Sequence, residues 1–368
     1  MTSREKLERL LTCQKPADRR DIPVFPMMLT WPGTCSGICQ KDITTDTDKF
    51  LEALGKTFAV IGKPDCAMGA TPGDTIFIMG LPAKRPGFEL GDNDLYQFVE
   101  TDQFQDEHEY ERILEMGWFP WYAQYMCRIQ KPPLQGIDAF LGRMGLMGQN
   151  NGRVIGFLLS QGVEPIYHSA TGPIFDTLFM TRSIMPFLTD LAMDPGPIAD
   201  ICNKFTPGVT AQTIDTLKSF GGTRVGIFAM RSSATFISPD IFREIVWPAL
   251  KQQIETFWAA GITSVIHADG QWLPMLEFFK EVPRYSCHFE LDGDTDMFKT
   301  YDIIGGWHSF RGDVPAAMLA FGTPDEVSAY CEKLIPLCMK GGVMLGSGCE
   351  VPKNAKLECV KAMMDSVR

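Results

Sequence analysis

The sequence has no hydrophobic run long enough to cross a membrane and no surplus of basic residues. A membrane-spanning helix needs about 18 or more consecutive apolar residues, and no segment of the chain reaches that length. The 34 Lys and Arg are outnumbered by 45 Asp and Glu, which gives a formal net charge of -11. This charge argues against binding nucleic acid or anionic lipid through bulk electrostatics. With 45% hydrophobic residues, the chain can instead bury one large core.

The eleven cysteines form no compact disulfide framework, because their number is odd and their spacings are irregular. The opening residues MTSREKLERLL have the pattern of a charged amphipathic helix and not of a signal peptide. Free and mostly buried thiols are typical of a reducing compartment. We therefore expect a cytoplasmic protein.

Strand-like and helix-like segments alternate from about residue 163 onward. The strand-like runs are 164–169, 223–231, 263–269, 286–292, 305–310 and 342–348. The helix-like runs are 174–191, 195–219, 238–260, 272–280, 324–339 and 355–367. Repeated strand–helix units build a parallel sheet with right-handed crossovers. This pattern predicts an α/β protein with a (β/α)8 TIM barrel.

The N-terminal half is less regular. Its pattern predicts a helix over 4–12, a buried strand over 22–29, a loop over 30–42 and a helix over 46–62. Residues 70–160 are rich in Gly and Pro and are predicted to be an irregular insertion region, serving as a lid or an interface. The whole chain, 1–368, is then a single barrel domain with this insertion in its N-terminal half.

A doubly wound open sheet is the alternative fold. Such a sheet would place a G-x-G-x-x-G turn after its first strand to bind a dinucleotide. The segment after the first predicted strand is TWPGTCSG (30–37), which lacks that spacing. The barrel is therefore the favoured fold.

Reactive residue types follow several of the predicted strands. The catalytic groups of a parallel barrel come from the carboxyl ends of its strands. His267 and Asp269 lie two residues apart in SVIHADGQW, so their side chains leave the strand on the same side. Glu290 and Asp292 share a register in the next strand, and Cys349 ends LGSGCE. These five residues are the predicted catalytic residues.

Three of them could bind a metal ion. Zinc accepts imidazole, carboxylate and thiolate ligands, and a catalytic zinc has three protein ligands and one open position. His267, Asp269 and Cys349 supply this set. Other interpretations stay open: His267 as a hydrogen-bonded strand-end residue, Asp269 as a turn former, and Cys349 as an inert thiol or a nucleophile with His267 as its base.

A second group of residues could bind the substrate. Arg231, followed by two serines, could hold an anionic group or pair with a carboxylate of the barrel. The tryptophans and methionines could line an apolar pocket or belong to the core. The candidates are His168, Arg231, Trp31, Met27, Met28 and Trp272.

Segments spread over nearly the whole chain resemble the uroporphyrinogen decarboxylase superfamily, with the weakest resemblance across 70–160. SREKLERLLTCQKPADRRDIPVFP resembles its opening, and FISPDIFREIVWPALKQQIE resembles its S-P-x-x-F…P-x-x-K helix. FELDGDTD, GDVPAAMLAFGTPDEV and GVMLGSGCEVP resemble its later strands. The resemblance implies a TIM barrel of that type.

The decarboxylases of this superfamily carry an arginine-rich R-Q-A-G-R stretch after the first strand, which holds the substrate carboxylates. The matching stretch here, MMLTWPGTCSG (27–37), contains no arginine. A polyanionic porphyrinogen would lack its counter-charges. A decarboxylase is therefore not expected. VIHADGQW lies where corrinoid-dependent members of the superfamily show an H-x-C zinc motif, so the chain resembles their methyltransferase branch.

That branch moves a methyl group to the Co(I) of a corrinoid, and its thiol-activating members bind zinc through H-x-C and a later G-x-G-C cysteine. His267 and Cys349 match this pattern, whereas Asp269 replaces the first cysteine. A harder N/O/S site suits an oxygen substrate better than a thiol. The resemblance implies the methyltransferase I component of an aryl methyl ether O-demethylase, an enzyme of anaerobic one-carbon metabolism.

The chain lacks a D-x-H-x-x-G corrinoid-binding signature, so the cobalamin-type corrinoid is expected on a partner protein. Zn²⁺ would polarise the ether oxygen, or else Asp269 or Glu290, protonated through desolvation, would act as general acid. The alternatives are a methylamine or thiol as methyl donor or acceptor, a decarboxylase, a zinc hydrolase, and a non-enzymatic binder of a small ligand. The oligomeric state stays open, with a homodimer as one possibility.

Overall fold

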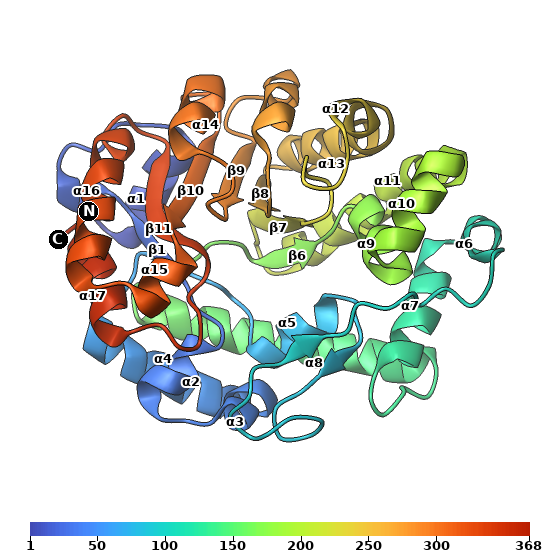
Figure 1. The fold of residues 1–368 in the computed structure, drawn as a ribbon, viewed down its shortest axis with the longest axis horizontal. Helices are drawn as coiled ribbons and strands as arrows, with labels where there is room; N and C mark the ends of the chain where they lie inside the picture. The colour runs from blue at the N-terminus through green and yellow to red at the C-terminus, as the bar shows by residue number, and fades with distance from the viewer.

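A seven-stranded parallel sheet forms the centre of the computed structural model, which describes residues 1–368 (Figure 1). Its strands are ordered β1-β11-β10-β9-β8-β7-β6, and every neighbouring pair is parallel. Their bounds are β1 (Val24–Met27), β6 (Ser169–Thr171), β7 (Arg224–Ala229), β8 (Thr263–Ala268), β9 (Cys287–Leu291), β10 (Ser309–Val314) and β11 (Val343–Glu350). The sheet curls into a TIM-barrel-like half-barrel, so the predicted fold class is confirmed.

A short parallel pair, β2 (Cys66–Ala67) and β5 (Glu164–Pro165), bridges the two edges of this sheet. On one side β5 leads along the chain into β6. On the other side the amide of Asp65 donates to the carbonyl oxygen of Val24 on β1, at 3.0 Å. The side chain of Asp65 also accepts a hydrogen bond from the Val24 amide, at 3.0 Å. These bonds link the first and middle strands of the chain around the core.

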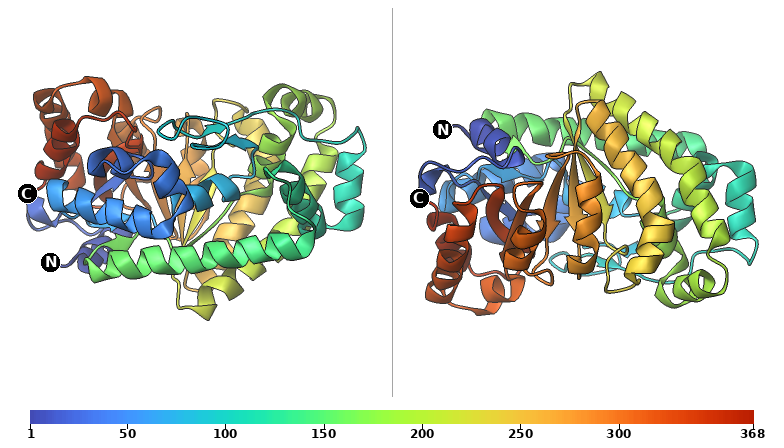
Figure 2. Two further views of the ribbon diagram at one scale, coloured as in Figure 1. Left: turned by 90° about the horizontal axis from the view of Figure 1, so that it is seen from below. Right: turned by 90° about the horizontal axis from the view of Figure 1, so that it is seen from above.

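Helices pack around the outside of the strands (Figure 2). The N-terminal ones are α1 (Ser3–Leu11), α2 (Trp31–Ser36), α3 (Gln40–Thr45), α4 (Thr47–Ile61), α5 (Pro72–Ile78), α6 (Glu109–Met116), α7 (Trp118–Ile129) and α8 (Ile137–Ser160). The later ones are α9 (Ile174–Arg182), α10 (Ile184–Met193), α11 (Gly196–Ser219), α12 (Pro239–Ile241), α13 (Trp247–Ala259), α14 (Met297–Ile304), α15 (Ala316–Phe321), α16 (Pro324–Cys338) and α17 (Leu357–Asp365). A π turn (Phe242–Val246) and 3-10 helices (Arg19–Asp21, Leu273–Glu281) complete the set. No helix is both long enough and apolar enough to span a bilayer.

Side-chain caps define several helix starts. Asp46 accepts from the amides of Asp48 and Lys49 and begins α4, as expected. Thr323 and Glu326 form a capping box at the start of α16. The helices predicted over 4–12, 46–62, 195–219 and 324–339 are confirmed to within a few residues.

Three local predictions were wrong. The loop expected over 30–42 contains α2 and α3, because Pro32 suits a first helical turn and Gly37, at φ +74°, ends α2. The single helix expected over 174–191 breaks at Ser183, whose φ is +65°. The strand expected over 305–310 starts at Ser309, because Gly305 and Gly306 form the turn before it.

The region 70–160 is more regular than predicted. Its second half consists of α6, α7 and the 24-residue α8, the long green helix along the outside of the molecule in Figure 2. Glycine lowers helix propensity, and five glycines in α8 hide the helical periodicity in the sequence. Burial of Phe140, Met147, Val154 and Leu158 in the large core cluster compensates for that propensity. The antiparallel pair β3 (Ala83–Lys84) and β4 (Gln97–Phe98) lies in the first half.

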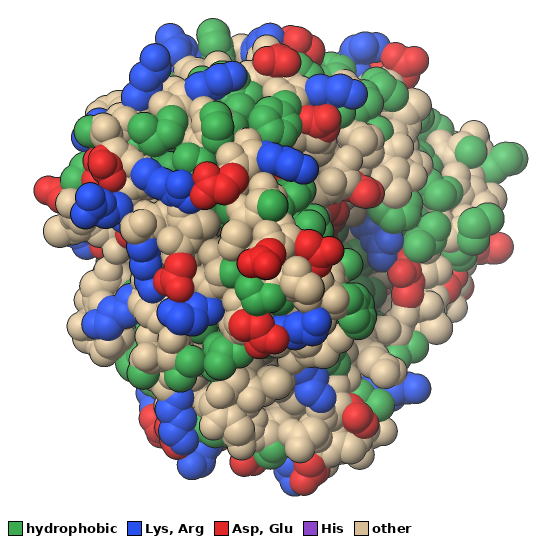
Figure 3. Space-filling view, turned by 60° about the vertical axis from the view of Figure 1, so that its left-hand side comes forward, with side chains coloured by type: hydrophobic (Ala, Val, Ile, Leu, Met, Phe, Trp, Pro, Cys, Tyr) green, Lys and Arg blue, Asp and Glu red, His purple; other side chains and the backbone are tan.

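The core is one large apolar cluster with a smaller cluster beside it that includes residues of β1, β8 and β11. All eleven cysteines are unpaired and seven are buried, which confirms the prediction of mostly buried thiols. On the face in Figure 3, acidic and basic side chains are interspersed around a hollow, with no one-signed patch.

Gly346 in β11 lies against two neighbouring strands. A Cβ at this position would lie 2.5 Å from the backbone oxygen of Phe25 and 3.0 Å from Cγ of Arg311. Because the backbone of β1 cannot yield by half an ångström without losing its pairing, only glycine fits here.

We expect Gly346→Ala to lower the free energy of unfolding by about 1–3 kcal/mol, the usual cost of overpacking. Gly148→Ala is the matched control, because its Cβ would meet nothing within 4 Å on exposed α8. That change should raise stability by up to about 1 kcal/mol. Thermal unfolding of the two variants measures both effects, and equal midpoints would contradict this account of β11.

Candidate functional site

Three residues from separate stretches of the chain converge at the carboxyl ends of β8, β9 and β11. His267 is on β8 and is paired in register with Glu290 on β9. Asp269 follows β8 directly, and Cys349 is the seventh residue of β11. One side-chain ligand atom each from His267, Asp269 and Cys349 lies within 4.8 Å of the others. The structure therefore brings together the three residues that the sequence predicted as metal ligands.

The two nitrogens of His267 face different partners. Nδ1 lies 2.9 Å from Oε2 of Glu290, whereas Nε2 lies 3.3 Å from Oδ1 of Asp269. An ionised carboxylate only accepts hydrogen bonds, so Nδ1 carries the proton and donates to Glu290. In the neutral ring, Nε2 then presents its lone pair to Asp269 and Cys349. Glu290 is thus not placed as a further ligand, because it occupies the opposite edge of the ring.

Charges around the site keep Glu290 ionised. Burial alone would raise the pKa of its carboxyl group, but the guanidinium of Arg311 and the imidazole of His267 lower that pKa below its usual value. Burial likewise would lower the pKa of His267, whereas Asp269, Cys349 and Glu290 together raise it well above the usual value. Glu290 is therefore unsuited to the role of a protonated general acid, which was one of the alternatives from the sequence.

The donor set fits a zinc ion. Tetrahedral zinc, with bonds of about 2.0–2.3 Å to N, O and S, holds its ligand atoms roughly 3.4–3.6 Å apart. The 3.3 Å between Nε2 and Oδ1 is close to that spacing. Oδ1 of Asp269 is buried and has no hydrogen-bond partner, and a metal ion is one group that would satisfy it. The Nδ1 bond to Glu290 is the carboxylate–histidine contact that usually orients a metal-binding imidazole.

Asp292 supports the loop that carries Asp269. Its two carboxylate oxygens accept from the amides of Gly270 at 2.6 Å and Asp294 at 3.0 Å. Burial raises the pKa of Asp292, although these amide bonds oppose the shift. The predicted catalytic role of Asp292 stays a prediction, and its contacts indicate a scaffold for the turn.

Trp272, Trp31 and Met28 are fully or almost fully buried in the large core cluster. The indole of Trp272 donates to the carbonyl oxygen of Asp269 at 3.0 Å, and that of Trp31 donates to the carbonyl oxygen of Ala355 at 2.9 Å. These placements favour the alternative that they are core residues over a role in a substrate pocket. Met27 is also buried, and its sulfur lies 3.9 Å from a guanidinium nitrogen of Arg311.

His168 lies at the wrong end of the barrel for a substrate-binding residue. Its amide bonds to the carbonyl oxygen of Arg224, the first residue of β7, whereas His267 is level with Phe228, the fifth. The strand predicted over 164–169 is observed as two strands, β5 (Glu164–Pro165) and β6 (Ser169–Thr171), so His168 precedes β6 and lies near the amino ends of the strands. This position argues against the substrate-binding role of His168, which stays a prediction.

Arg231 follows β7 at the same end of the barrel as the site. Its guanidinium lies 4.9 Å from the ring centroid of Phe236 and 2.9 Å from the carboxylate of Glu100. Its backbone amide donates to Asp176 at 2.6 Å. Arg231 is therefore paired with a carboxylate, which was one of the two alternatives expected from the sequence. The carboxylate belongs to the region 70–160 and not to the barrel.

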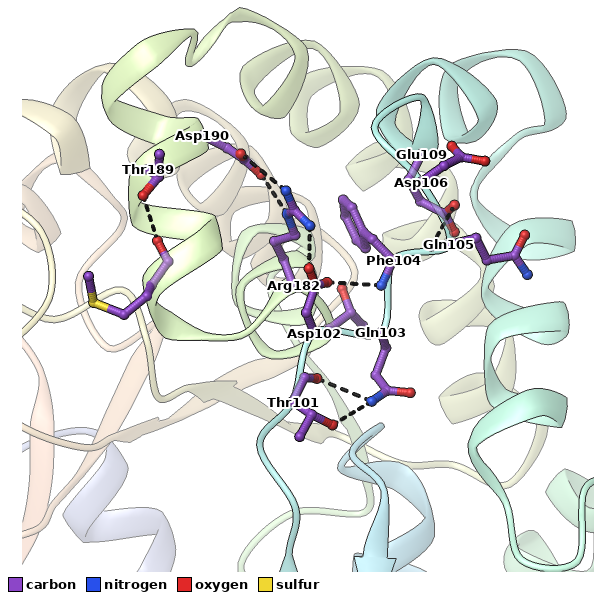
Figure 4. Close-up of polar contacts among 12 residues, drawn as sticks. Thr101, Asp102, Gln103, Phe104, Gln105, Asp106, Glu109, Arg182, Thr189 and Asp190 are labelled. Carbon is purple, nitrogen blue, oxygen red and sulfur yellow. Dashed lines mark hydrogen bonds and ion pairs between the residues drawn. The ribbon is translucent and has the colours of Figure 1, made fainter.

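Glu100 belongs to a segment that we call the strap, residues 91–106, which lies along the carboxyl-end rim. At one end, Asn93 accepts a hydrogen bond from the side chain of Lys353 beyond β11. At the other end, Asp102 pairs with Arg182, which also binds Asp190 (Figure 4). The strap is thus fixed to the end of β11 and to helices α9 and α10.

Tyr96 of the strap is a candidate residue that the sequence did not single out. Its phenol lies close enough to the carboxylate of Glu350, which neighbours Cys349, for that carboxylate to raise the pKa of Tyr96 further after burial. The same carboxylate accepts from the amide of Thr30 at 2.8 Å. Burial raises the pKa of Tyr96, so its phenol stays protonated. No motif marks Tyr96, because its position depends on the long-range packing of the strap.

The structure is a barrel with a partly buried N/O/S donor cluster at the carboxyl ends of its strands. A family model described as "Uroporphyrinogen decarboxylase (URO-D)" matches residues 160–368. The chain belongs to the uroporphyrinogen decarboxylase family. The matched part contains β5 to β11 and therefore His267, Asp269, Glu290 and Cys349.

Among solved structures, a methyltransferase from Methanosarcina mazei has a TM-score of 0.68 at 14% sequence identity, with 100% of this chain and 98% of that chain covered. At this identity the likeness shows a shared fold. Dispersin B, at a TM-score of 0.35 and 10% identity over 60% of this chain and 76% of that chain, carries no argument. No curated protein matches the chain.

We expect His168→Gln to change the pH dependence of stability without affecting the site. Burial, followed by the charges of Arg224 and Arg4, lowers the pKa of His168 to about 4, below the usual value of about 6.5. Between these values the unfolded chain binds a proton that the folded chain does not, so stability falls as the pH drops from 6.5 toward 4. The fall in melting temperature from pH 7 to pH 5 should be smaller in the variant. Equal falls in both proteins would contradict this pKa.

Proposed function

We propose that the chain is a methyltransferase that takes the methyl group of an aromatic methyl ether and passes it to the Co(I) corrinoid of a separate protein. The observation that carries this proposal is the donor set of His267, Asp269 and Cys349, with His267 oriented by Glu290. Such a site suits the activation of an oxygen atom, because its ligands are one nitrogen, one oxygen and one sulfur. The described activity of the Methanosarcina neighbour, a methyltransferase, supports the same reaction class.

The reaction breaks the bond between the methyl carbon and the ether oxygen. Co(I) supplies an electron pair for the new carbon–cobalt bond, and the electron pair of the broken bond stays on oxygen. The oxygen leaves as phenoxide and takes up a proton from solvent. Since phenoxide is a poor leaving group, the rate depends on how well its developing charge is stabilised.

Nε2 of His267, the carboxylate of Asp269 and the sulfur of Cys349 would hold a zinc ion. When bound, zinc would supply Lewis-acid stabilisation of the leaving oxygen. Glu290 holds the ring of His267 so that Nε2 points toward Asp269. Asp292 and Trp272 hold the turn that presents Asp269. The strap would help to position the ether at the rim.

A porphyrinogen decarboxylase is the competing activity within the family. Residues 27–37, which begin with the last residue of β1, contain no arginine. Arg311, on β10, is fully buried and paired with Glu290, 3.6 Å away. Neither feature provides a free guanidinium that could bind the carboxylates of a polyanionic substrate. Methyl transfer is therefore the better-supported function.

We expect the purified chain to bind about one equivalent of zinc and His267→Ala or Cys349→Ala to lose most of it. Removing one of three ligands leaves an incomplete site, and zinc affinity should fall at least 100-fold. The matched control is His108→Ala, because His108 has a largely exposed side chain away from the site. Metal analysis after dialysis gives the result, and equal zinc in all four proteins would end the metal proposal.

Mixed with a Co(I) corrinoid protein and a methoxybenzene, the chain should form methyl-Co(III), which is followed by absorbance. We expect His267→Ala to lower this rate on the order of 10²–10⁴-fold, the size expected when the leaving oxygen loses its stabilising group. Methylation from a methylamine or a methylated thiol but not from the ether would contradict the proposed donor. Ether cleavage without corrinoid would indicate a hydrolase.

A further inference from the structure

Arg311 is a fully buried cation whose presence the reaction itself does not explain. It lies in the middle of β10, and its exposed fraction is 0%. Burying an arginine costs several kcal/mol unless charge and hydrogen bonds compensate. If this position served packing alone, an apolar side chain of the same volume would fill it without the cost of burying a charge.

The contacts of Arg311 lead toward the donor cluster. Its Nε lies 3.6 Å from Oε1 of Glu290, and Nη1 donates to the carbonyl oxygen of Ser347, two residues before Cys349. The guanidinium also lies 4.8 Å from the ring centroid of Phe25, within the range of a cation–π contact. These contacts hold the guanidinium between β1, β9 and β11.

The backbone of β11 leaves room for this side chain. A Cβ at Gly346 would come within 3.0 Å of Cγ and 3.1 Å of Cδ of Arg311. Gly346 thus admits a long buried cation beside the strand that carries Cys349. A purely apolar interior would not require that space.

Besides Arg311, only the imidazole of His267 pairs with Glu290, and a metal-bound imidazole is neutral. Its Oε2 accepts from Nδ1 of His267, and its Oε1 has no hydrogen-bond partner. The nearby His288 makes its own bond to Ser309, at 2.9 Å. Glu290 is only 1% exposed, so without Arg311 it would be an uncompensated buried anion beside the imidazole.

We propose that Arg311 is a positioning residue for the metal site, holding the Glu290 carboxylate where it orients His267 toward Asp269 and Cys349. This inference rests on the proposed zinc site but not on the identity of the methyl donor. The three side chains form one line of contacts, with Arg311 to Glu290 at 3.6 Å and Glu290 to His267 at 2.9 Å. Arg311 contacts none of the three donor residues directly, and we assign its effect on zinc binding to Glu290 and not to the backbone bond at Ser347.

The test is the zinc affinity of Arg311→Met, measured in the whole chain by competition with a chromogenic chelator. We expect the affinity to fall about 10–100-fold, the usual effect of removing an outer partner of a metal-binding histidine. The visible absorption spectrum of the Co²⁺-substituted protein should also change, because the orientation of the imidazole changes. Arg311→Lys keeps the charge without the planar guanidinium and should lose less affinity.

Arg224→Met is the matched control. Arg224 is also a buried barrel arginine, and its guanidinium lies 3.7 Å from Glu164. It starts β7 near the amino ends of the strands, away from the donor cluster. We expect this variant to lose thermal stability while zinc affinity and the Co²⁺ spectrum stay unchanged.

The double variant Arg311→Met/Glu290→Gln keeps the test decisive if Arg311→Met alone does not fold, since it removes both buried charges. If Arg311 acts through Glu290, the double variant binds zinc as weakly as Glu290→Gln and no more weakly. Unchanged zinc affinity in Arg311→Met, or additive losses in the double variant, would overturn the proposal. Zinc binding is measured without corrinoid or ether, so a failure of methyl transfer would be recognised separately.

Discussion

The site depends on one hydrogen bond, from Nδ1 of His267 to the carboxylate of Glu290 at 2.9 Å. This bond selects the ring tautomer and leaves Nε2 free to face Asp269 and Cys349. It also accounts for a buried carboxylate in the barrel interior, where Glu290 is paired with Arg311. The packing of β8, β9, β10 and β11 therefore sets the geometry of the donor cluster as well as forming the sheet.

The fold was predictable because strands and helices alternate clearly after residue 163. His267 and Asp269 were identified from their two-residue spacing at a strand end, and Cys349 from its place after a glycine-rich strand. These signals come from residues that are close together in the sequence, so they can be recognised without the structure. The position of His168 was not predictable to the same degree, because shifting a strand by a few residues moves its last residue to the opposite end of the barrel.

Features built from long-range packing could not be read from the sequence. The sequence marked Glu290 as reactive but did not show whether it is a ligand, an acid or an orienting group, since that depends on which ring nitrogen it meets. The contact of Tyr96 with Glu350 depends on the strap, which is fixed by ion pairs between distant segments. Trp31 and Trp272 likewise needed the structure to show that they are core residues.

The central claim is that His267, Asp269 and Cys349 bind one metal ion as a mixed N/O/S set. X-ray absorption at the zinc edge of the purified chain tests it most directly. The account predicts one sulfur at about 2.3 Å and nitrogen or oxygen neighbours at about 2.0–2.2 Å. A shell without sulfur, or with two or more sulfurs, would contradict it.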